Sequence, residues 1–250
     1  VMRTLTILNQ LGVQTSHTAA TITQTDELIV KGVGLHGFQE SKDILYCGNS
    51  GTTMRLMLGL LAAQPFTSRL TGDASLNKRP MERVMEPLRK MGAEFSVEQK
   101  NGQRVICVNP ELRTRFAVPL QGIEYKMPIA SAQVKTAILI AGLYAQCETK
   151  IVERLSSRNH TEIMMAEMGI PIQTNGNRIT LKAKTPHALV PPRSGGLEIP
   201  GDMSSAAFLI VAALITKKSF LMIKDVNLNP TRTGALDVLI QMGAQIEIHN

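Results

Sequence analysis

The chain has 250 residues, of which 44% are hydrophobic and 19% charged, a balance that excludes an intrinsically disordered protein. A formal net charge of +7 favours anionic partners, but basic and aromatic residues do not alternate, so nucleic-acid binding is disfavoured. The three cysteines, Cys47, Cys107 and Cys147, lack the spacing of a disulfide framework or a zinc site and suit a reducing cytoplasm. The longest apolar run, 206–215, is too short to span a bilayer.

A short phrase that closes an amphipathic segment with glycine recurs four times along the chain. It reads "LNQLGV", "LRKMGA", "MAEMGI" and "LIQMGA", and it places Gly12, Gly92, Gly169 and Gly243 at intervals of 80, 77 and 74 residues. Glycine directly after the last periodic residue is typical of a left-handed helix cap. Alternating stretches such as "AEFSVEQ" and "AQIEIHN" follow, and we expect these to be strands.

A second recurring phrase begins with small hydroxyl or amide residues and continues as an apolar helix. These helices are predicted over 50–64, 131–146 and 204–217, and each precedes a strand-like run: 66–73, 147–154 and 219–226. Because the helices are apolar nearly all round, they should be buried, whereas the amphipathic helices that end in glycine should lie outward. The fold class predicted is therefore α/β (α+β), with duplicated units of helices inside a shell of strands.

A joint between structural blocks is predicted over 182–202, which holds four prolines and three glycines. We place the domain boundary close to Pro200, which gives domains of 1–199 and 200–250. The second stretch is one unit alone, too small to be stable by itself.

The stretch "YCGNSGTTMR" places two glycines and several hydroxyls immediately before an apolar helix. Gly48 and Gly51 would let the backbone approach a ligand, while Asn49, Ser50 and Thr52 would supply caps or contacts. Unpaired N–H groups and the helix dipole make such a helix start attractive to anions. The alternative is a well-capped core helix that binds nothing.

Arginines precede the second helix of successive units, at Arg79, Arg158 and Arg232. The helix dipole disfavours a cation there, so these positions indicate an anion between the guanidinium groups, which can hold carboxylate or phosphate bidentately. Repeat ancestry alone could also preserve such an arginine, and Arg232 is the candidate for that explanation.

Other polar groups carry weaker signals. Ser131 and Gln133 open a buried helix, where the alternative is simple capping beside a solvated Lys135. His160 could act as a general base, although a loop histidine that caps a helix is the more common case. The histidines lack metal-ligand spacing, and the serine-hydrolase, P-loop and Rossmann motifs are absent.

Five ordered motifs resemble the enolpyruvyl transferase family, and within it the branch that acts on shikimate 3-phosphate. They are "GNSGTTMRL", "LTGDASLNKRPMERVMEPLRKMGA", "ASAQVKTAILIAGLYA", "SSRNHTE" and "PGDMSSAAFLIVAA". The resemblance implies an inside-out α/β barrel of repeated βαβαββ units, here incomplete. It also implies transfer of the enolpyruvyl group of phosphoenolpyruvate to the 5-hydroxyl of shikimate 3-phosphate, with release of phosphate and without a metal or other cofactor.

Site residues follow from the resemblance position by position. Those matching the phosphoenolpyruvate site are Asn49, Gly51, Arg79 and Gln133. Those matching the shikimate 3-phosphate site are Ser131, Ala132, Gln133, Ser157 and Arg158. Ala132 stands where many relatives have serine, so only its backbone could contribute. Arg55 is also a family feature, which we interpret as structural support.

The resemblance further implies that the "GDKS…R" motif, the acidic general base and the "KE[ST]DR" segment lie outside 1–250. We therefore expect a central fragment of a longer enzyme, inactive alone, whose acid and base residues are unknown and which the rest of its own chain could complete. Two alternatives remain open at this point. One is an enolpyruvyl transferase acting on a nucleotide sugar, and the other is a non-catalytic or nucleic-acid-processing module on the same repeat fold.

Overall fold

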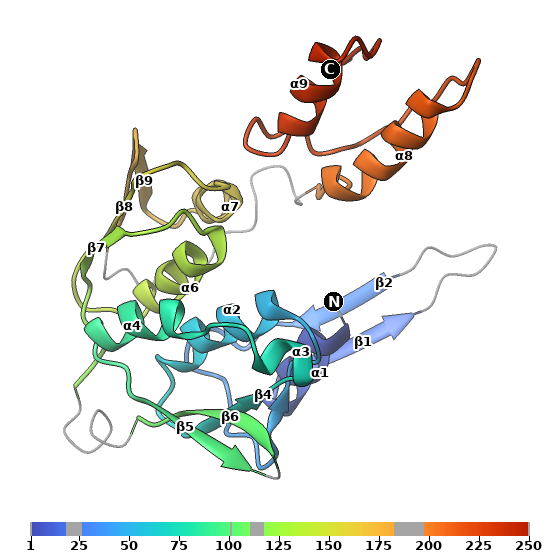
Figure 1. Ribbon diagram of the computed structural model, residues 1–250. Coiled ribbons are helices and arrows are strands. Elements are labelled where there is room, and N and C mark those ends of the chain that lie inside the picture. The colour runs from blue at the N-terminus through green and yellow to red at the C-terminus, as the bar shows by residue number, and fades with distance from the viewer. Residues whose placement is uncertain (1, 19–26, 101, 111–117, 183–197, 250) are drawn as a thin grey trace. The chain divides into compact units, whose positions relative to one another are not determined.

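The computed structural model describes residues 2–18, 27–100, 102–110, 118–182 and 198–249 (Figure 1). The chain divides into two compact units, which are treated separately. Unit 1 comprises Val1–Leu155 and Pro171–Pro186, and unit 2 comprises Ser156–Ile170 and His187–Asn250. Most of the predicted joint, 183–197, lies outside the described residues, so the proposed boundary at Pro200 stays a prediction.

Unit 1 opens with a helix and a two-stranded ribbon. Helix α1 (Met2–Gln10) is followed by β1 (Gln14–Thr18) and β2 (Glu27–Lys31), which pair antiparallel. The N–H of Gln39 donates to the carbonyl of Leu11 at 2.9 Å, which ties the following loop to the end of α1.

The first complete repeat forms a four-stranded sheet in the order β3-β4-β6-β5. Its elements are β3 (Leu45–Tyr46), α2 (Gly51–Leu61), β4 (Ser68–Thr71), α3 (Ala74–Asn77), α4 (Glu82–Lys90), β5 (Phe95–Lys100) and β6 (Gln103–Val108). Strands β3 and β4 are parallel, as expected for two strands joined through a helix, and β6 pairs antiparallel with both β4 and β5.

The second repeat has the same connectivity, with its sheet in the order β7-β8-β10-β9. Its elements are β7 (Glu124–Met127), α6 (Ala132–Gly142), β8 (Thr149–Glu153), α7 (His160–Glu167), β9 (Ile172–Asn175) and β10 (Arg178–Leu181), of which α7 belongs to unit 2. Again the first two strands are parallel and the last strand lies between its neighbours. The predicted βαβαββ repeat is confirmed for these two copies.

Helices α2 and α6 pack against each other at the centre of unit 1, each beside a strand of its own sheet (Figure 1). Leu58 and Leu139 are fully buried, in agreement with the apolar pattern of both helices. The two helices lie close together at Gly59, where an added Cβ would be 2.4 Å from the carbonyl oxygen of Ala137. The predicted burial of these helices is confirmed, and glycine is what permits their close contact.

The four recurring glycines have positive φ angles, as a left-handed cap requires. The values are 88° for Gly12, 97° for Gly92, 73° for Gly169 and 94° for Gly243. The caps of α1, α4, α7 and α9 (Gly234–Gln241) are therefore confirmed.

Unit 2 differs from the sequence prediction in its third copy of the repeat. Helix α8 (Met203–Ile215) buries only Met203 and Ala206, while Phe208 is 80% exposed, so the predicted burial is wrong for this helix. The runs 219–226 and 244–249 form no strand, and an isolated parallel bridge joins Gly201 to Val226. Backbone needs a neighbouring strand to form a ladder, and the described residues of unit 2 supply none.

No helix among the described residues is both long and apolar enough to cross a membrane. The cysteines are free thiols, with Cys47 and Cys107 buried and Cys147 exposed. Burial raises the pKa of Cys47 from an ordinary value of 9.0 to about 12, so this side chain is a neutral core residue.

Lys135 is buried, so the alternative of a solvated side chain at this position is wrong. Its side chain is 1% exposed, and its ammonium lies 3.1 Å from the carboxylate of Glu153 on β8, which is 4% exposed. Periodicity along α6 could not reveal this partner, because Glu153 lies on the next strand of the repeat. The buried ion pair ties the first turn of α6 to its sheet.

Candidate functional site

The start of the loop before α2 is fixed to the end of strand β4 and to the residues that directly follow that strand. The N–H of Cys47 donates to the carbonyl of Thr71 at 2.9 Å, and the N–H of Asp73 donates to the carbonyl of Gly48 at 2.8 Å. Gly48 has a φ of 59°, which favours glycine at this turn. The exposed side chain of Asn49 therefore sits on a loop with a defined path.

Ser50 caps α2, as the hydroxyl-rich motif predicts. Its Oγ accepts a hydrogen bond from the N–H of Thr53 at 3.1 Å. The N–H groups of Gly51 and Thr52 have no acceptor within the described part of the chain. Two donors at the positive end of the helix dipole are thus available to an anion.

Two guanidinium groups meet the backbone at Gly51. A Cβ added there would lie 2.7 Å from Nη1 of Arg55 and 3.2 Å from Nη1 of Arg79. Any larger residue would therefore displace an arginine. Both positive groups face the helix start whose N–H groups are free, which is the arrangement that stabilises a bound anion.

Arg55 is the buried member of this cluster, and it was interpreted from the sequence as structural support. It is 4% exposed, its Nη1 donates to Oε1 of Gln133 at 2.5 Å, and its Nε has no hydrogen-bond partner among the described residues. Desolvation lowers the pKa of Arg55, and the positive charges of Arg83 and Arg79 lower it further. A buried donor without an acceptor is costly, which indicates that this site is built for an anionic guest.

Gln133 joins the starts of α2 and α6. Its Nε2 donates to Oγ1 of Thr52 at 2.6 Å, while its Oε1 accepts from Arg55. Ser131 caps α6 by accepting from the N–H of Val134 at 3.4 Å. Gln133 is therefore oriented by both helices, and the structure brings it together with Gly51 and Arg79.

The positive charge of this cluster is not neutralised by ion pairs. Within the described residues, Arg79 and Arg83 form no ion pair, and Glu82 beside them pairs with Arg89. Asp73 is the nearby carboxylate, and its pKa is lowered first by the hydrogen bond from the N–H of Leu76 and also by Arg79. Asp73 is therefore ionised at neutral pH and is no proton donor.

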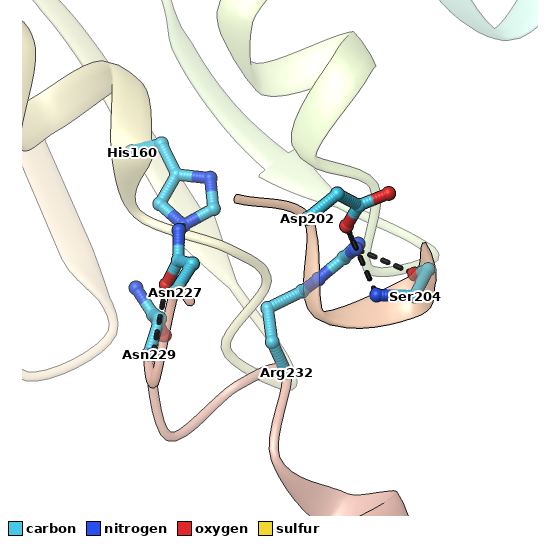
Figure 2. Close-up of polar contacts among 6 residues, drawn as sticks. All are labelled: His160, Asp202, Ser204, Asn227, Asn229 and Arg232. Atoms are coloured by element: carbon cyan, nitrogen blue, oxygen red, sulfur yellow. Dashed lines mark hydrogen bonds and ion pairs between the residues drawn. The ribbon is translucent and has the colours of Figure 1, made fainter. Parts of the chain in front are cut away.

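Ser157 and Arg158 lie in unit 2, in the half-buried stretch before α7. This stretch is attached to the loop before α9 (Figure 2). Nδ2 of Asn229 donates to Oδ1 of Asn159 at 2.7 Å, and Nδ2 of Asn227 lies 3.3 Å from Nε2 of His160. His160 is thus the first residue of α7 and contacts an asparagine, rather than capping the helix.

Arg232 has a partner of its own, unlike Arg79. Its guanidinium pairs with Asp202, the N-cap of α8, and donates to Oγ of Ser204 at 2.6 Å (Figure 2). The pKa of Asp202 is lowered first by the N–H of Ser204 and also by Arg232. Arg232 therefore holds the loop before α9 to the start of α8. Its guanidinium is already paired with the carboxylate of Asp202.

Two further positive charges near this helix start were not assigned to a ligand from the sequence, those of Arg55, interpreted as structural support, and of Arg83. Their spacing was the available signal, since Gly51 and Arg55 lie four residues apart on one helix and share a face. Arg79 and Arg83 have the same spacing at the entry to α4. The predicted roles of the individual site residues stay predictions.

Comparisons with known proteins agree over the whole chain. The family model described as EPSP synthase (3-phosphoshikimate 1-carboxyvinyltransferase) matches residues 1–250. Proteins named 3-phosphoshikimate 1-carboxyvinyltransferase from Thermodesulfovibrio yellowstonii and Petrotoga mobilis are 46% and 47% identical over 249 residues, which is 100% of this chain and 54% of each relative. A solved structure of EPSP synthase from Acinetobacter baumannii is 40% identical with a TM-score of 0.80, and the match covers 100% of this chain and 52% of that one. The chain spans about half the length of the relatives it matches.

Proposed function

Because the chain belongs to the EPSP synthase family, we propose that it carries part of the site that transfers the enolpyruvyl group of phosphoenolpyruvate to the 5-hydroxyl of shikimate 3-phosphate. It would thus serve the shikimate pathway of aromatic amino acid biosynthesis as part of a transferase. The names of the relatives favour this substrate over a nucleotide sugar. Three free thiols fit a cytoplasmic location.

One observation carries the proposal: two guanidinium groups converge on Gly51, beside free N–H groups, and no carboxylate in the described part of the chain pairs with them. We assign this site to phosphoenolpyruvate, with Asn49, Gly51, Arg79 and Gln133 as its binding residues. Arginine pairs hold the phosphate and carboxylate groups of such a ligand through charge-assisted hydrogen bonds. The same charges would stabilise the phosphate that leaves during the reaction.

The residues proposed for the second substrate, shikimate 3-phosphate, follow from the resemblance of the motifs "ASAQVKTAILIAGLYA" and "SSRNHTE". The proposed residues are Ser131, Ala132, Gln133, Ser157 and Arg158. Gln133 would be near both ligands, since it already contacts Thr52 of α2. Ala132 would contribute only its backbone, as the first residue of α6.

Proton transfer between the hydroxyl and the enol carbon needs acid and base groups. Asp73 is held in its ionised form, and none of the residues assigned to the two ligands is a carboxylic acid. We therefore propose that this chain binds its ligands without turning them over, and that 200–250 is the first unit of a second domain. A phosphate-release assay on this chain should show no activity above the buffer rate.

Replacing Arg79 by methionine should weaken the binding of phosphoenolpyruvate about tenfold or more, because a charge-assisted contact is lost. Isothermal titration at low salt measures this affinity directly. Arg69→Met is the matched control, since Arg69 is an exposed arginine on β4. Equal affinities of the two variants would contradict the assignment of Arg79.

A further inference from the structure

Helix α1 contacts the anion site through a chain of three hydroxyl groups. Oγ1 of Thr4 lies 2.9 Å from Oγ1 of Thr53, which lies 2.8 Å from Oγ of Ser50. That Oγ is the same atom that accepts from the N–H of Thr53 to cap α2. Thr53 is only 6% exposed, so water does not readily substitute for these partners. The orientation of the capping hydroxyl therefore depends on a residue of α1.

The neighbouring residue of α1 contacts the same loop from its other end. The guanidinium of Arg3 lies over the ring of Tyr46, 5.2 Å from the centroid. Its Nε would lie 3.5 Å from a Cβ added at Gly48, so the side chain lies along the loop backbone. Arg3 forms no ion pair within the described residues, and its charge adds to the positive potential around this loop.

We infer that Arg3 and Thr4 are positioning residues for the anion site, holding the loop 46–51 in the shape that presents the N–H groups of Gly51 and Thr52. This inference rests on the proposed function of that site. The physical reason is that the cap needs Oγ of Ser50 near the N–H of Thr53, and a serine side chain without further partners can rotate away from that position. The hydroxyl of Thr53, fixed by Thr4, leaves the Ser50 hydroxyl one favourable orientation. Neither residue is among those proposed to bind a ligand.

The test replaces Thr4 by valine, which removes the hydroxyl and keeps the shape of the side chain. We expect amide hydrogen exchange at Thr53, whose N–H donates to the capping hydroxyl of Ser50, to accelerate about three- to tenfold, as for loss of one part-buried hydrogen bond. Affinity for phosphoenolpyruvate, measured by titration well below the unfolding temperature, should fall by a similar factor. Exchange at Ile106 on β6 should not change, which separates a local effect from global destabilisation.

Two further variants keep the result interpretable. Thr6→Val makes the same change on the same helix, but the hydroxyl of Thr6 bonds only to the carbonyl of Met2 in the exposed first turn, so the loop should be unaffected. Thr4→Ser keeps the hydroxyl, so amide exchange at Thr53 and affinity for phosphoenolpyruvate should both stay close to those of the wild-type chain.

Unchanged exchange at Thr53 in Thr4→Val, or an equal acceleration in Thr6→Val, would overturn the inference. If the exchange changes as expected while neither the wild-type chain nor any variant binds phosphoenolpyruvate, the positioning role stands and the proposed function fails.

Discussion

Glu153→Gln is expected to lower the free energy of unfolding of unit 1 by about 3–5 kcal/mol, because it removes a buried negative charge 3.1 Å from the ammonium of Lys135. The substituted amide has nearly the same shape, so the loss comes from charge rather than from a cavity. Urea denaturation followed by circular dichroism measures the change. The double variant Lys135→Met with Glu153→Leu should recover most of the stability, since apolar residues of similar volume can replace a buried pair.

The matched control for this prediction is Glu148→Gln. Glu148 pairs with Lys150 at 3.1 Å in the same region, but the side chains are 45% and 37% exposed. Solvent screens such a pair, so the cost should be below about 1 kcal/mol. An equal effect of the two variants would mean that the Lys135–Glu153 pair is open to water.

Gly59→Ala is expected to destabilise unit 1 by about 2–3 kcal/mol, against the usual preference of a helix for alanine. Alanine normally gains about 1 kcal/mol over glycine inside a helix. Here its Cβ would meet backbone atoms of Ala137 at 2.4, 2.8 and 2.9 Å, and backbone cannot rotate away. Overpacking of this kind costs about 1–3 kcal/mol or more, so the separation of α2 and α6 must increase. Calorimetric unfolding measures the loss.

Gly234→Ala should have the opposite effect on stability. Gly234 is the first residue of α9, and nothing lies within 4 Å of an added Cβ. The substitution should leave stability unchanged or raise it by up to about 1 kcal/mol. If Gly59→Ala also proved neutral, the close contact between α2 and α6 would be wrong, and with it the placement of Gln133 beside Arg55.

The repeat was predictable from the sequence because its signals are local. A glycine after an amphipathic segment, such as Gly92, needs no distant partner to adopt a positive φ, and an apolar helix such as 51–61 shows its burial in its composition. Strand pairing and the burial of α8 depend on neighbours. The run 219–226 has strand-like residues and still forms no ladder, because local propensity does not supply a partner.

The site was partly predictable for the same reason. The residues 48–52 predict a capped helix start, because the residues that form the cap are neighbours in the sequence. The contacts of Arg55 could not be predicted, because it donates to a glutamine 78 residues away and no spacing reveals its burial. The alternative of a solvated Lys135 was wrong for a similar reason, since a carboxylate partner lies 18 residues away on another element.

The most direct test of the central claim is a titration of the isotope-labelled chain with phosphoenolpyruvate, followed by amide and side-chain chemical shifts. We expect the largest changes in chemical shift at the N–H groups of Gly51 and Thr52, at the guanidinium of Arg55 and at the side-chain amide of Gln133. Added salt should weaken the binding and so reduce all of these changes at a given ligand concentration. Largest changes elsewhere, or none at these four groups at saturation, would contradict the anion site at the start of α2.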